Sequence, residues 1–345
     1  MALKKDLILR SARRARLEGR TAPFQPASAT VSPAQPPVIL IAGPTASGKS
    51  MLALELAAAV GGTIINGDAL QIYRDLRILS ARPDEAVLAR VPHRLYGYLD
   101  AAERGSAGRW RGLALAAIGD AHKDGRLPIV VGGTGLYLRA LQHGLVAIPP
   151  IPAAIRAEAA ALYRALGGAA FRERLVALDP VAASRLSVGD RQRLMRAWEV
   201  VSATGRRIGE WQAGPAAAAP YRFASILLAS PREALYAACD ARFRGMIAAG
   251  GLDEAATLAA RDLDPELPAM KAVGVPELLR HLKGDITLDE AVAAAMRATR
   301  RYVKRQMTWF RHQMVPDLVL DAQLSESLLR CSRHFIDHFL LTGRT

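Results

Sequence analysis

Residues 38–50 read VILIAGPTASGKS, and this short stretch decides the fold. An apolar run at 38–41 leads into a glycine-rich loop, and the pattern that follows predicts an amphipathic helix over 50–60. Residues 43–50 match the pattern G-x-x-x-x-G-K-[ST], and the strand and helix around them distinguish a phosphate-binding loop from a chance glycine turn. The stretch therefore predicts a P-loop between a strand and a helix.

The residues of this P-loop indicate how a phosphorylated substrate is held. They are Gly43, Pro44, Thr45, Ala46, Ser47, Gly48, Lys49 and Ser50. Backbone N–H groups of such a loop close around phosphate oxygens, and the amino end of the helix adds positive potential. Lys49 would neutralise phosphate charge, and Ser50 is the candidate ligand for Mg²⁺, the cofactor that we expect.

Outward from the P-loop, short apolar runs alternate with helical patterns. The sequence predicts strands at 63–65, 127–131 and 221–228, and a helix that begins at residue 136. Such alternation is typical of βαβ units with helices on both faces of a parallel sheet. The predicted fold class is therefore α/β, a P-loop NTPase-like parallel sheet core with a helical insertion domain and a helical C-terminal part.

Changes in composition divide the chain into four parts. Residues 1–37 are basic and then rich in proline, so we expect a flexible basic arm, although an organellar transit peptide would have a similar composition. The α/β core is expected at 38–145 and 216–322, interrupted by a helical insertion at 146–215. Residues 323–345 are expected to form a helical tail.

The composition narrows the classes of function. The 345 residues include 46 Lys and Arg against 32 Asp and Glu, and the formal net charge of +14 points to a polyanionic partner such as nucleic acid. An Arg-rich composition without such a partner is the alternative. The only cysteines, Cys239 and Cys331, are too few for a disulfide scaffold and suit a reducing cytoplasm. No apolar run approaches the ~20 residues that cross a bilayer, so we expect no membrane protein.

Asp68 is the candidate acidic residue of the site. The strand at 127–131 does not run into the Asp that P-loop NTPases use as a second metal ligand. Asp68 instead follows the strand at 63–65, at the edge where open α/β sheets bind ligands. It could hold Mg²⁺ through water, act as a general base, or cap the turn at 69–73.

A second glycine loop, Gly132-Gly133-Thr134-Gly135, lies at another predicted junction of strand and helix. Its amides and the Thr134 hydroxyl are expected to face the same cleft as the P-loop, so that two loops could grip one diphosphate. Turn chemistry alone is the alternative, because glycine is common in such turns.

A capping box at Thr287 and Glu290 predicts the start of a long helix with an apolar stripe and a basic face. Its cations are Arg297, Arg300, Arg301, Lys304, Arg305 and Arg311, with no acidic residue among them. Like charges one turn apart repel one another by about 0.2–0.5 kcal/mol for each pair. The phosphate backbone of a nucleic acid would relieve this repulsion, and a solvated basic face is the alternative.

Six blocks of the chain, taken in order, resemble the tRNA dimethylallyltransferases, also called tRNA isopentenyltransferases. The blocks are GPTASGKS at 43–50, DALQIYR at 68–74, VPH at 91–93, VGGTGLY at 131–137, DRQR with RAWEV at 190–200, and KRQMTWFR at 304–311. A P-loop alone is unspecific, whereas this ordered combination is specific. The pattern departs from that of the family at 274–277, where GVPE replaces a usual Gly-Tyr-Lys/Arg-Glu.

The resemblance implies an enzyme that transfers the dimethylallyl group from dimethylallyl diphosphate to N6 of the adenine at position 37 of tRNA, next to the anticodon, and releases diphosphate. Its partners would be this donor and the tRNA anticodon stem-loop, which the helical insertion would grip. We expect a cytoplasmic monomer. The alternatives are a P-loop small-molecule kinase, a prenyltransferase that acts on free adenine nucleotides, and an RNA-binding protein without catalysis.

The resemblance also assigns site residues. Asp68 looks like the general base that takes a proton from the adenine amine, while Thr134 and Arg242 would steady the leaving group, with Arg244 as an alternative alignment. The implied tRNA contacts are Asp68, Ala69, Leu70, Gln71, Arg156, Gln192, Arg193, Leu194, Met195 and Arg196.

Overall fold

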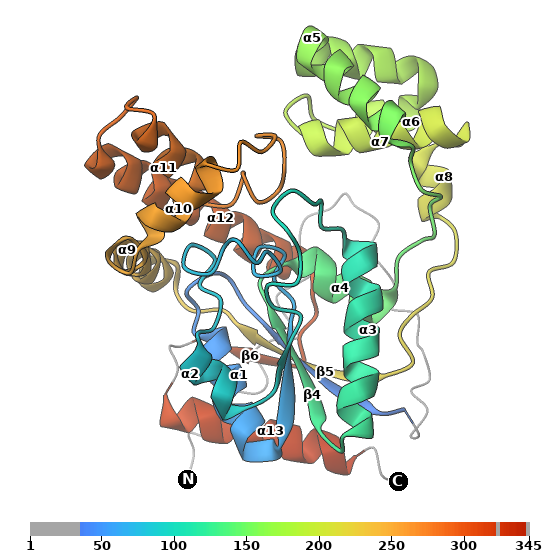
Figure 1. Ribbon diagram of the computed structural model, residues 1–345. Coiled ribbons are helices and arrows are strands. Elements are labelled where there is room, and N and C mark those ends of the chain that lie inside the picture. The colour runs from blue at the N-terminus through green and yellow to red at the C-terminus, as the bar shows by residue number, and fades with distance from the viewer. Residues whose placement is uncertain (1–34, 322–324, 343–345) are drawn as a thin grey trace. The chain divides into compact units, whose positions relative to one another are not determined.

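The computed structural model describes residues 35–321 and 325–342, so the basic arm predicted at 1–37 lies almost entirely outside the described residues. Six strands form one sheet in the order β3-β2-β4-β1-β5-β6, and every pairing is parallel. Figure 1 shows the sheet with helices around it. The strands are β1 (Pro37–Ala42), β2 (Gly62–Asn66), β3 (His93–Arg94), β4 (Leu127–Gly132), β5 (Arg222–Leu228) and β6 (Leu318–Leu320). The predicted parallel α/β fold is thus confirmed.

Alternate residues of the central strand enter two separate cores. Val38 and Leu40 of β1 pack with helices α3 (Ala107–Lys123) and α4 (Gly135–His143) on one face of the sheet. Ile39 and Ile41 pack with α1 (Lys49–Val60) on the other. Burial on both faces explains why the sequence of β1 is apolar throughout.

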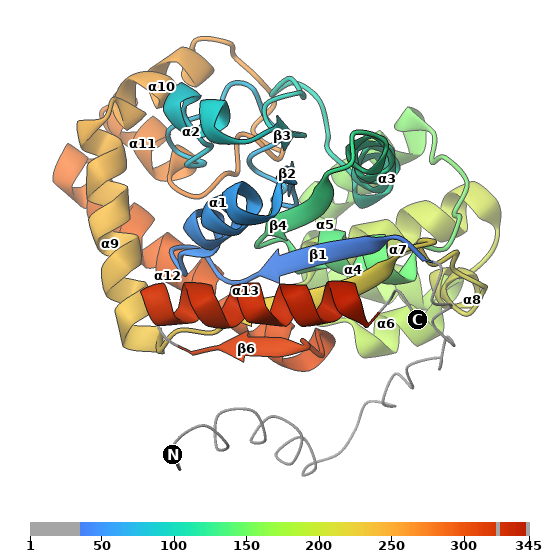
Figure 2. The same cartoon turned by 90° about the horizontal axis from the view of Figure 1, so that it is seen from below.

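The last helix, α13 (Glu326–Leu341), lies against α1 and β5 and on the same side of the molecule as β1 in Figure 2. Its Ile336 is fully buried in the same core as Leu52 and Leu56 of α1. The sequence analysis set residues 323–345 apart as a tail. The helix instead completes one layer of the α/β core, because its apolar side chains recur at helical spacing and find α1 and the sheet as partners.

The first compact unit of the chain extends to Gln142 and resumes at Pro220. Besides the sheet it contains α2 (Glu85–Arg90), α9 (Arg232–Ala248), α10 (Gly251–Ala259), α11 (Val275–Leu282) and α12 (Leu288–Gln313). The predicted capping box begins α12: Thr287 Oγ1 accepts from the Glu290 N–H at 3.2 Å, and Glu290 accepts from the Thr287 N–H at 2.8 Å.

Residues 143–219 form a second compact unit, in the region where the helical insertion is expected. Its helices are α5 (Ala153–Leu178), α6 (Pro180–Arg185), α7 (Arg191–Thr204) and α8 (Ile208–Gln212). Phe171 and Leu175 of α5 pack with Leu194 and Ala197 of α7. The unit therefore has a hydrophobic core of its own.

The two ends of the second unit approach each other closely. Gly144 has a φ of +81°, and a Cβ at this position would lie 2.3 Å from the carbonyl oxygen of Ala217. Only glycine combines this backbone conformation with so close an approach of another chain segment.

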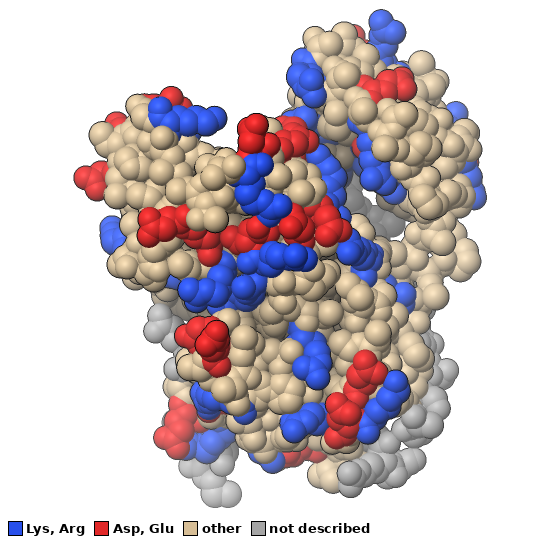
Figure 3. Space-filling model, in the orientation of Figure 1, with Lys and Arg blue, Asp and Glu red and all other residues tan. Residues whose placement is uncertain are grey.

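The surface carries charges of both signs. On the face shown in Figure 3, Asp and Glu side chains gather beside Lys and Arg side chains. Ion pairs such as Arg109–Glu103 and Lys271–Glu266, each at 2.8 Å, contribute to this mixture. Within residues 35–321 and 325–342, none of the helices has both the length and the apolar character that crossing a membrane requires.

Candidate active site

The P-loop turns from β1 into α1 through backbone conformations that favour glycine. Gly48, directly before α1, has a φ of +84°, and Ala46 also has a positive φ, of 61°. A Cβ on Gly43 would lie 2.7 Å from Ser47 Oγ and 3.0 Å from the carbonyl oxygen of Leu228. No side chain of the described residues caps the start of α1, so the N–H groups of its first turn can bind an anion.

Two side chains of the P-loop offer hydrogen-bond donors to a ligand. Ser47 is buried, and its Oγ has no hydrogen-bond partner among the described residues. Lys49 Nζ donates to the carbonyl oxygen of Pro44 at 3.1 Å. Because an unpaired buried hydroxyl is costly, Ser47 Oγ is well placed to donate to an anion bound by this loop.

One pocket of the first unit combines the P-loop with side chains from other segments. It is lined by Thr45, Lys49, Ser50, Asp68, Leu70, Gln71, Leu79, Ser80, Cys239, Arg242, Phe243, Met246, Val273, Thr299 and Tyr302. The P-loop with Lys49 and Arg242 forms what we call the cationic part. What we call the apolar wall consists of Leu70, Leu79, Phe243, Met246 and Val273. The pocket can therefore hold a molecule that joins a phosphate group to a hydrocarbon.

The charged groups of the pocket influence one another. Withdrawal from water lowers the pKa of Lys49 to about 8, and the Asp68 carboxylate opposes this shift. Burial also lowers the pKa of the Arg242 guanidinium, again against the attraction of Asp68. Asp68 thus lies near both cations, while Arg244, the alternative alignment, is exposed. A polyanionic ligand would favour the protonated form of Lys49.

Asp68 is held by the end of β2. Its N–H donates to Asn66 Oδ1 at 2.9 Å, and Asn66 Nδ2 donates to the carbonyl oxygens of Asp68 and Leu95. Asp68 Oδ1 accepts from the Leu70 N–H at 2.9 Å, so the carboxylate does cap the following turn. Oδ2 forms no hydrogen bond within the described part of the chain and would lie 3.5 Å from a Cβ on Gly133. One oxygen orients the carboxylate, and the other is left for a substrate.

Thr134 is not one of the residues that line the pocket. Its Oγ1 accepts from the Ala69 N–H at 2.9 Å, and it also hydrogen-bonds to Tyr302, whose pKa is raised by burial. The glycines of this second loop allow close packing, since a Cβ on Gly135 would lie 2.1 Å from the ring of Trp309. In this geometry Thr134 positions the segment that carries Asp68, and its contact with a leaving group stays a prediction.

Gln306 connects the two glycine loops, and the sequence analysis missed it. Its Oε1 accepts from the Thr45 N–H at 2.9 Å and from Thr45 Oγ1 at 3.2 Å, while its Nε2 donates to the carbonyl oxygen of Gly133 at 2.9 Å. The residue is 5% exposed. An amide within the buried stripe of α12 is a readable signal, because buried polar groups are almost always paired.

At least one cation on the basic face of α12 pairs with an acidic side chain. Arg300 Nη1 lies 3.3 Å from Asp240 Oδ2 of α9, so the expectation of six uncompensated cations is wrong for this residue. The partner comes from another helix and leaves no trace in the local sequence. The exposed cations are Arg297, Arg301, Lys304, Arg305 and Arg311.

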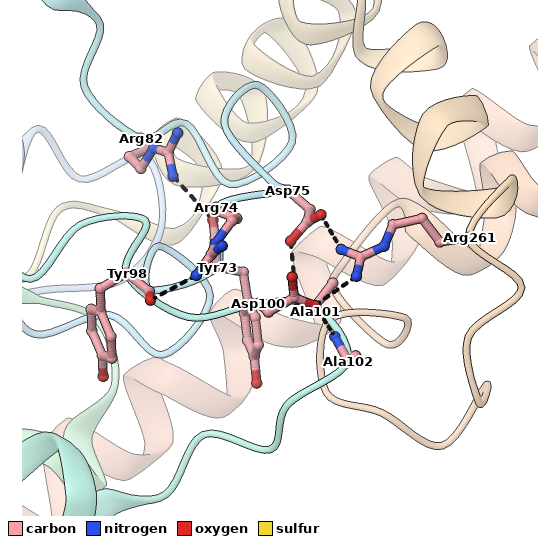
Figure 4. Close-up of polar contacts among 9 residues, drawn as sticks. All are labelled: Tyr73, Arg74, Asp75, Arg82, Tyr98, Asp100, Ala101, Ala102 and Arg261. Carbon is pink, nitrogen blue, oxygen red and sulfur yellow. Dashed lines mark hydrogen bonds and ion pairs between the residues drawn. The ribbon is translucent and has the colours of Figure 1, made fainter.

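A charged network fixes the long connections that follow β2 and β3 (Figure 4). Arg261 contacts Asp75 through Nη1 and Asp100 through Nη2, the latter at 2.7 Å. Asp75 Oδ2 also accepts from the Ala101 N–H at 2.9 Å. The segment after Asp68 is therefore bonded to a residue that follows α10, rather than forming a free loop.

The implied tRNA contacts of the second unit lie on α5 and α7. Arg156, Gln192 and Arg193 are exposed, and Met195 and Arg196 are half-buried. Leu194 is 0% exposed and packs in the core of the unit. The helical period turns the Leu194 side chain inward, so it is unsuited to a side-chain contact with tRNA, and the predicted contacts of this segment stay predictions.

The residues present fit a magnesium ion that arrives with its substrate. Within residues 35–321 and 325–342, no group of three or more His, Cys, Asp or Glu side chains could hold a metal ion. Ser50 and Asp68 line the pocket together. Because Mg²⁺ at phosphate sites takes one or two protein ligands and completes its shell with phosphate oxygens and water, the Ser50 hydroxyl would suffice as a direct ligand, with Asp68 nearby and able to act through water.

Family models match most of the chain. The IPP transferase model matches residues 71–313, and the isopentenyl transferase model matches residues 36–104. A tRNA dimethylallyltransferase of Rhodospirillum centenum is 60% identical over 284 residues, which are 82% of this chain and 90% of the relative. That of Rhodospirillum rubrum is 54% identical over 318 residues, which are 90% of this chain and 98% of the relative.

Solved structures with a similar fold include two transferases. The full-length tRNA isopentenylpyrophosphate transferase of Bacillus halodurans is 30% identical with a TM-score of 0.65, over 90% of this chain and 98% of the other. A eukaryotic dimethylallyltransferase, described as acting on tRNA, is 27% identical with a TM-score of 0.76, over 90% of this chain and 80% of the other. The similarity thus extends well beyond the P-loop.

Proposed function

This chain belongs to the IPP transferase family and prenylates tRNA, and from this premise we propose that it transfers a dimethylallyl group from dimethylallyl diphosphate to N6 of adenine 37, next to the anticodon. The observation that carries the proposal is that Lys49, Asp68 and Arg242 line one pocket with an apolar wall. The two cations can bind a diphosphate, the apolar wall can hold the hydrocarbon attached to it, and the carboxylate can accept a proton from an amine.

The cationic part of the pocket would bind the donor. Backbone N–H groups of the P-loop, Ser47 Oγ and Lys49 would hold diphosphate oxygens, and Arg242 would contribute from α9. As the allylic C–O bond breaks, its electron pair leaves with the diphosphate, whose growing negative charge these preorganised donors stabilise. Mg²⁺, when bound with the diphosphate at Ser50, would neutralise further charge.

Asp68 would act on the acceptor. The N6 lone pair forms the new C–N bond to the allylic carbon, and N6 then carries one proton too many. Asp68 Oδ2 would take this proton, because Oδ1 is engaged by the Leu70 N–H. The adenine must first leave its stack at a cost of roughly a few kcal/mol, which phosphate contacts from the exposed cations of α12 would help to offset.

The test is to incubate the purified protein with unmodified tRNA, Mg²⁺ and dimethylallyl diphosphate and to analyse the nucleosides by mass. Dimethylallyl adenosine is the expected product, and unchanged adenosine under these conditions would contradict the proposal. ATP offered without tRNA is the control, since its consumption would favour the kinase alternative. Asp68→Ala should retain tRNA binding and lose turnover, whereas a non-catalytic RNA-binding protein would form no product in either case.

We also propose that the protein works as a monomer in the cytoplasm. One chain supplies the P-loop, Arg242, Asp68 and the apolar wall, which are all the groups that the proposed reaction uses. Light scattering of the purified protein, alone and with tRNA, measures the oligomeric state, and a stable dimer would contradict this proposal.

A further inference from the structure

A carboxylate from a distant part of the chain binds the turn at residues 77–79. Glu254 Oε2 accepts from the N–H groups of Arg77 at 2.7 Å and Ile78 at 2.8 Å, and Glu254 Oε1 accepts from the Leu79 N–H at 2.8 Å. Successive backbone donors that converge on one anion form a nest of the kind that binds free anions in other proteins. Here the anion is a side chain of α10.

Apolar contacts hold the same turn against the start of α10. A Cβ on Gly251 would lie 3.1 Å from Leu79 Cδ2, and a Cβ on Gly250 would lie 3.6 Å from Ile78 Cδ1. Gly250 has a φ of +94°, the conformation that lets the chain turn out of α9 and present α10. Hydrogen bonds and packing therefore fix the turn from one helix.

The turn supplies part of the pocket. Leu79 and Ser80 are lining residues, whereas Glu254 is not. Leu79 belongs to the apolar wall, the part of the pocket that suits a hydrocarbon. A change at Glu254 would thus alter the pocket without removing a group that touches substrate.

A second set of hydrogen bonds links the turn to the segment that carries Asp68. Gln71 Nε2 donates to the carbonyl oxygens of Ser80 at 3.0 Å and Ala81 at 2.9 Å. Gln71 lines the pocket, three residues after Asp68. The wall and the catalytic segment are thereby bonded to each other as well as to α10.

We propose that Glu254 is a positioning residue that holds Leu79 in the apolar wall and so sets the length of prenyl donor that the pocket accepts. The proposal rests on the proposed function. In Glu254→Gln one carboxylate oxygen becomes an amide nitrogen that cannot accept, so one or two of the three adjacent N–H groups lose their acceptor and the turn is held less firmly against α10. The pocket then discriminates less between the dimethylallyl chain and a longer one.

The experiment compares Glu254→Gln with Asp253→Asn in the full-length protein. Asp253 is the preceding residue of α10, is exposed and forms no side-chain hydrogen bond among the described residues, so it is a matched control. For each protein, kcat and KM are measured with tRNA for dimethylallyl diphosphate and for geranyl diphosphate. For Glu254→Gln we expect kcat/KM for dimethylallyl diphosphate to fall about 10- to 100-fold, and the preference over geranyl diphosphate to fall about tenfold.

Two further measurements separate positioning from stability. Hydrogen exchange of the amides of residues 77–79 should be faster in Glu254→Gln and unchanged in Asp253→Asn. Glu254→Asp keeps the carboxylate and should recover part of the donor preference, and it also serves if Glu254→Gln fails to fold. A general loss of stability would lower the rates with both donors equally and leave their ratio unchanged.

The outcomes that overturn the inference are distinct from failure of the proposed function. An unchanged donor ratio in an active Glu254→Gln protein, or unchanged amide exchange, would overturn the role of Glu254 alone. A wild-type protein that prenylates no tRNA would overturn the proposed function, and the inference with it.

Discussion

The two parts of the pocket are built in different ways. The cationic part comes mostly from one continuous stretch, residues 43–50, in which Gly48 and the start of α1 create the anion site locally, and only Arg242 of α9 joins it from a distant segment. The apolar wall depends on Glu254, which reaches Leu79 across 175 positions of sequence. The P-loop can be recognised in the sequence because its residues act together within one short stretch and cannot be changed one at a time. A wall held from a distance can be altered by one substitution far from the substrate, which makes it the part where donor specificity can evolve.

Asp68 lies where the two parts meet, and Asp68→Asn gives the largest expected effect. The amide oxygen can still accept from the Leu70 N–H, so the turn should keep its shape while the base is lost. Turnover should fall by roughly 10²- to 10⁴-fold with tRNA affinity retained, as measured by single-turnover prenylation and by tRNA binding. A rate within a few-fold of wild type would contradict the role of Asp68 as the general base.

Gln306→Leu tests whether the cationic part is as local as its motif suggests. The substitution leaves the Thr45 N–H and the Gly133 carbonyl oxygen without their partner, at a cost of about 1–3 kcal/mol for a buried unpaired group. Urea unfolding should show this loss in the free energy of unfolding, together with weaker binding of inorganic diphosphate. Thr308→Ala, an exposed position on the same helix, is the control and should change neither. Unaltered diphosphate binding in Gln306→Leu would mean that the loop keeps its shape unaided.

The pH dependence of diphosphate binding tests the cationic part of the pocket separately from the apolar wall. The pKa of Lys49 is lowered to about 8, chiefly by burial, and a bound anion favours the charged form. The contribution of Lys49 to diphosphate affinity should therefore be constant below about pH 8 and fall by up to about tenfold for each pH unit above it. In Lys49→Arg the guanidinium stays charged and this component should vanish, so equal calorimetric profiles for the two proteins would contradict the assignment.

Arg261→Ala gives the smallest expected effect. Its ion pairs with Asp75 and Asp100 are partly exposed, so the melting temperature should fall slightly, and less at high salt. The pKa of Asp100 lies below its ordinary 3.8, first because of the Ala102 N–H and then because of Arg261. This stabilisation is present above pH 3.8 and is lost as the pH falls through the lowered value, so the difference between variant and wild type should disappear in acid. A difference that persists in acid would indicate lost packing instead.

Local patterns predicted much of the fold and of the site. The P-loop and the capping box of α12 were readable because each depends on residues close together in sequence, and the parallel sheet was readable because short apolar runs alternate with helical patterns along the chain. The places of α13 and of Arg300 were not, since each depends on a partner from another element, and the burial of Gln306 could be read from the stripe of α12 although its two partners could not. Leu194 shows the converse limit, because a family block names a stretch but not which of its side chains face inward.

The close approach of Gly144 to Ala217 has a consequence for how this protein came about. A segment that leaves and returns through one narrow stem can be exchanged as a unit, because its removal opens no gap wider than a turn between the chain segments on either side. Lineages could therefore lengthen, shorten or replace this appendage while inheriting the prenylation chemistry unchanged. The narrow stem itself depends on residue 144 being glycine, because any other residue would place a Cβ against the carbonyl oxygen of Ala217.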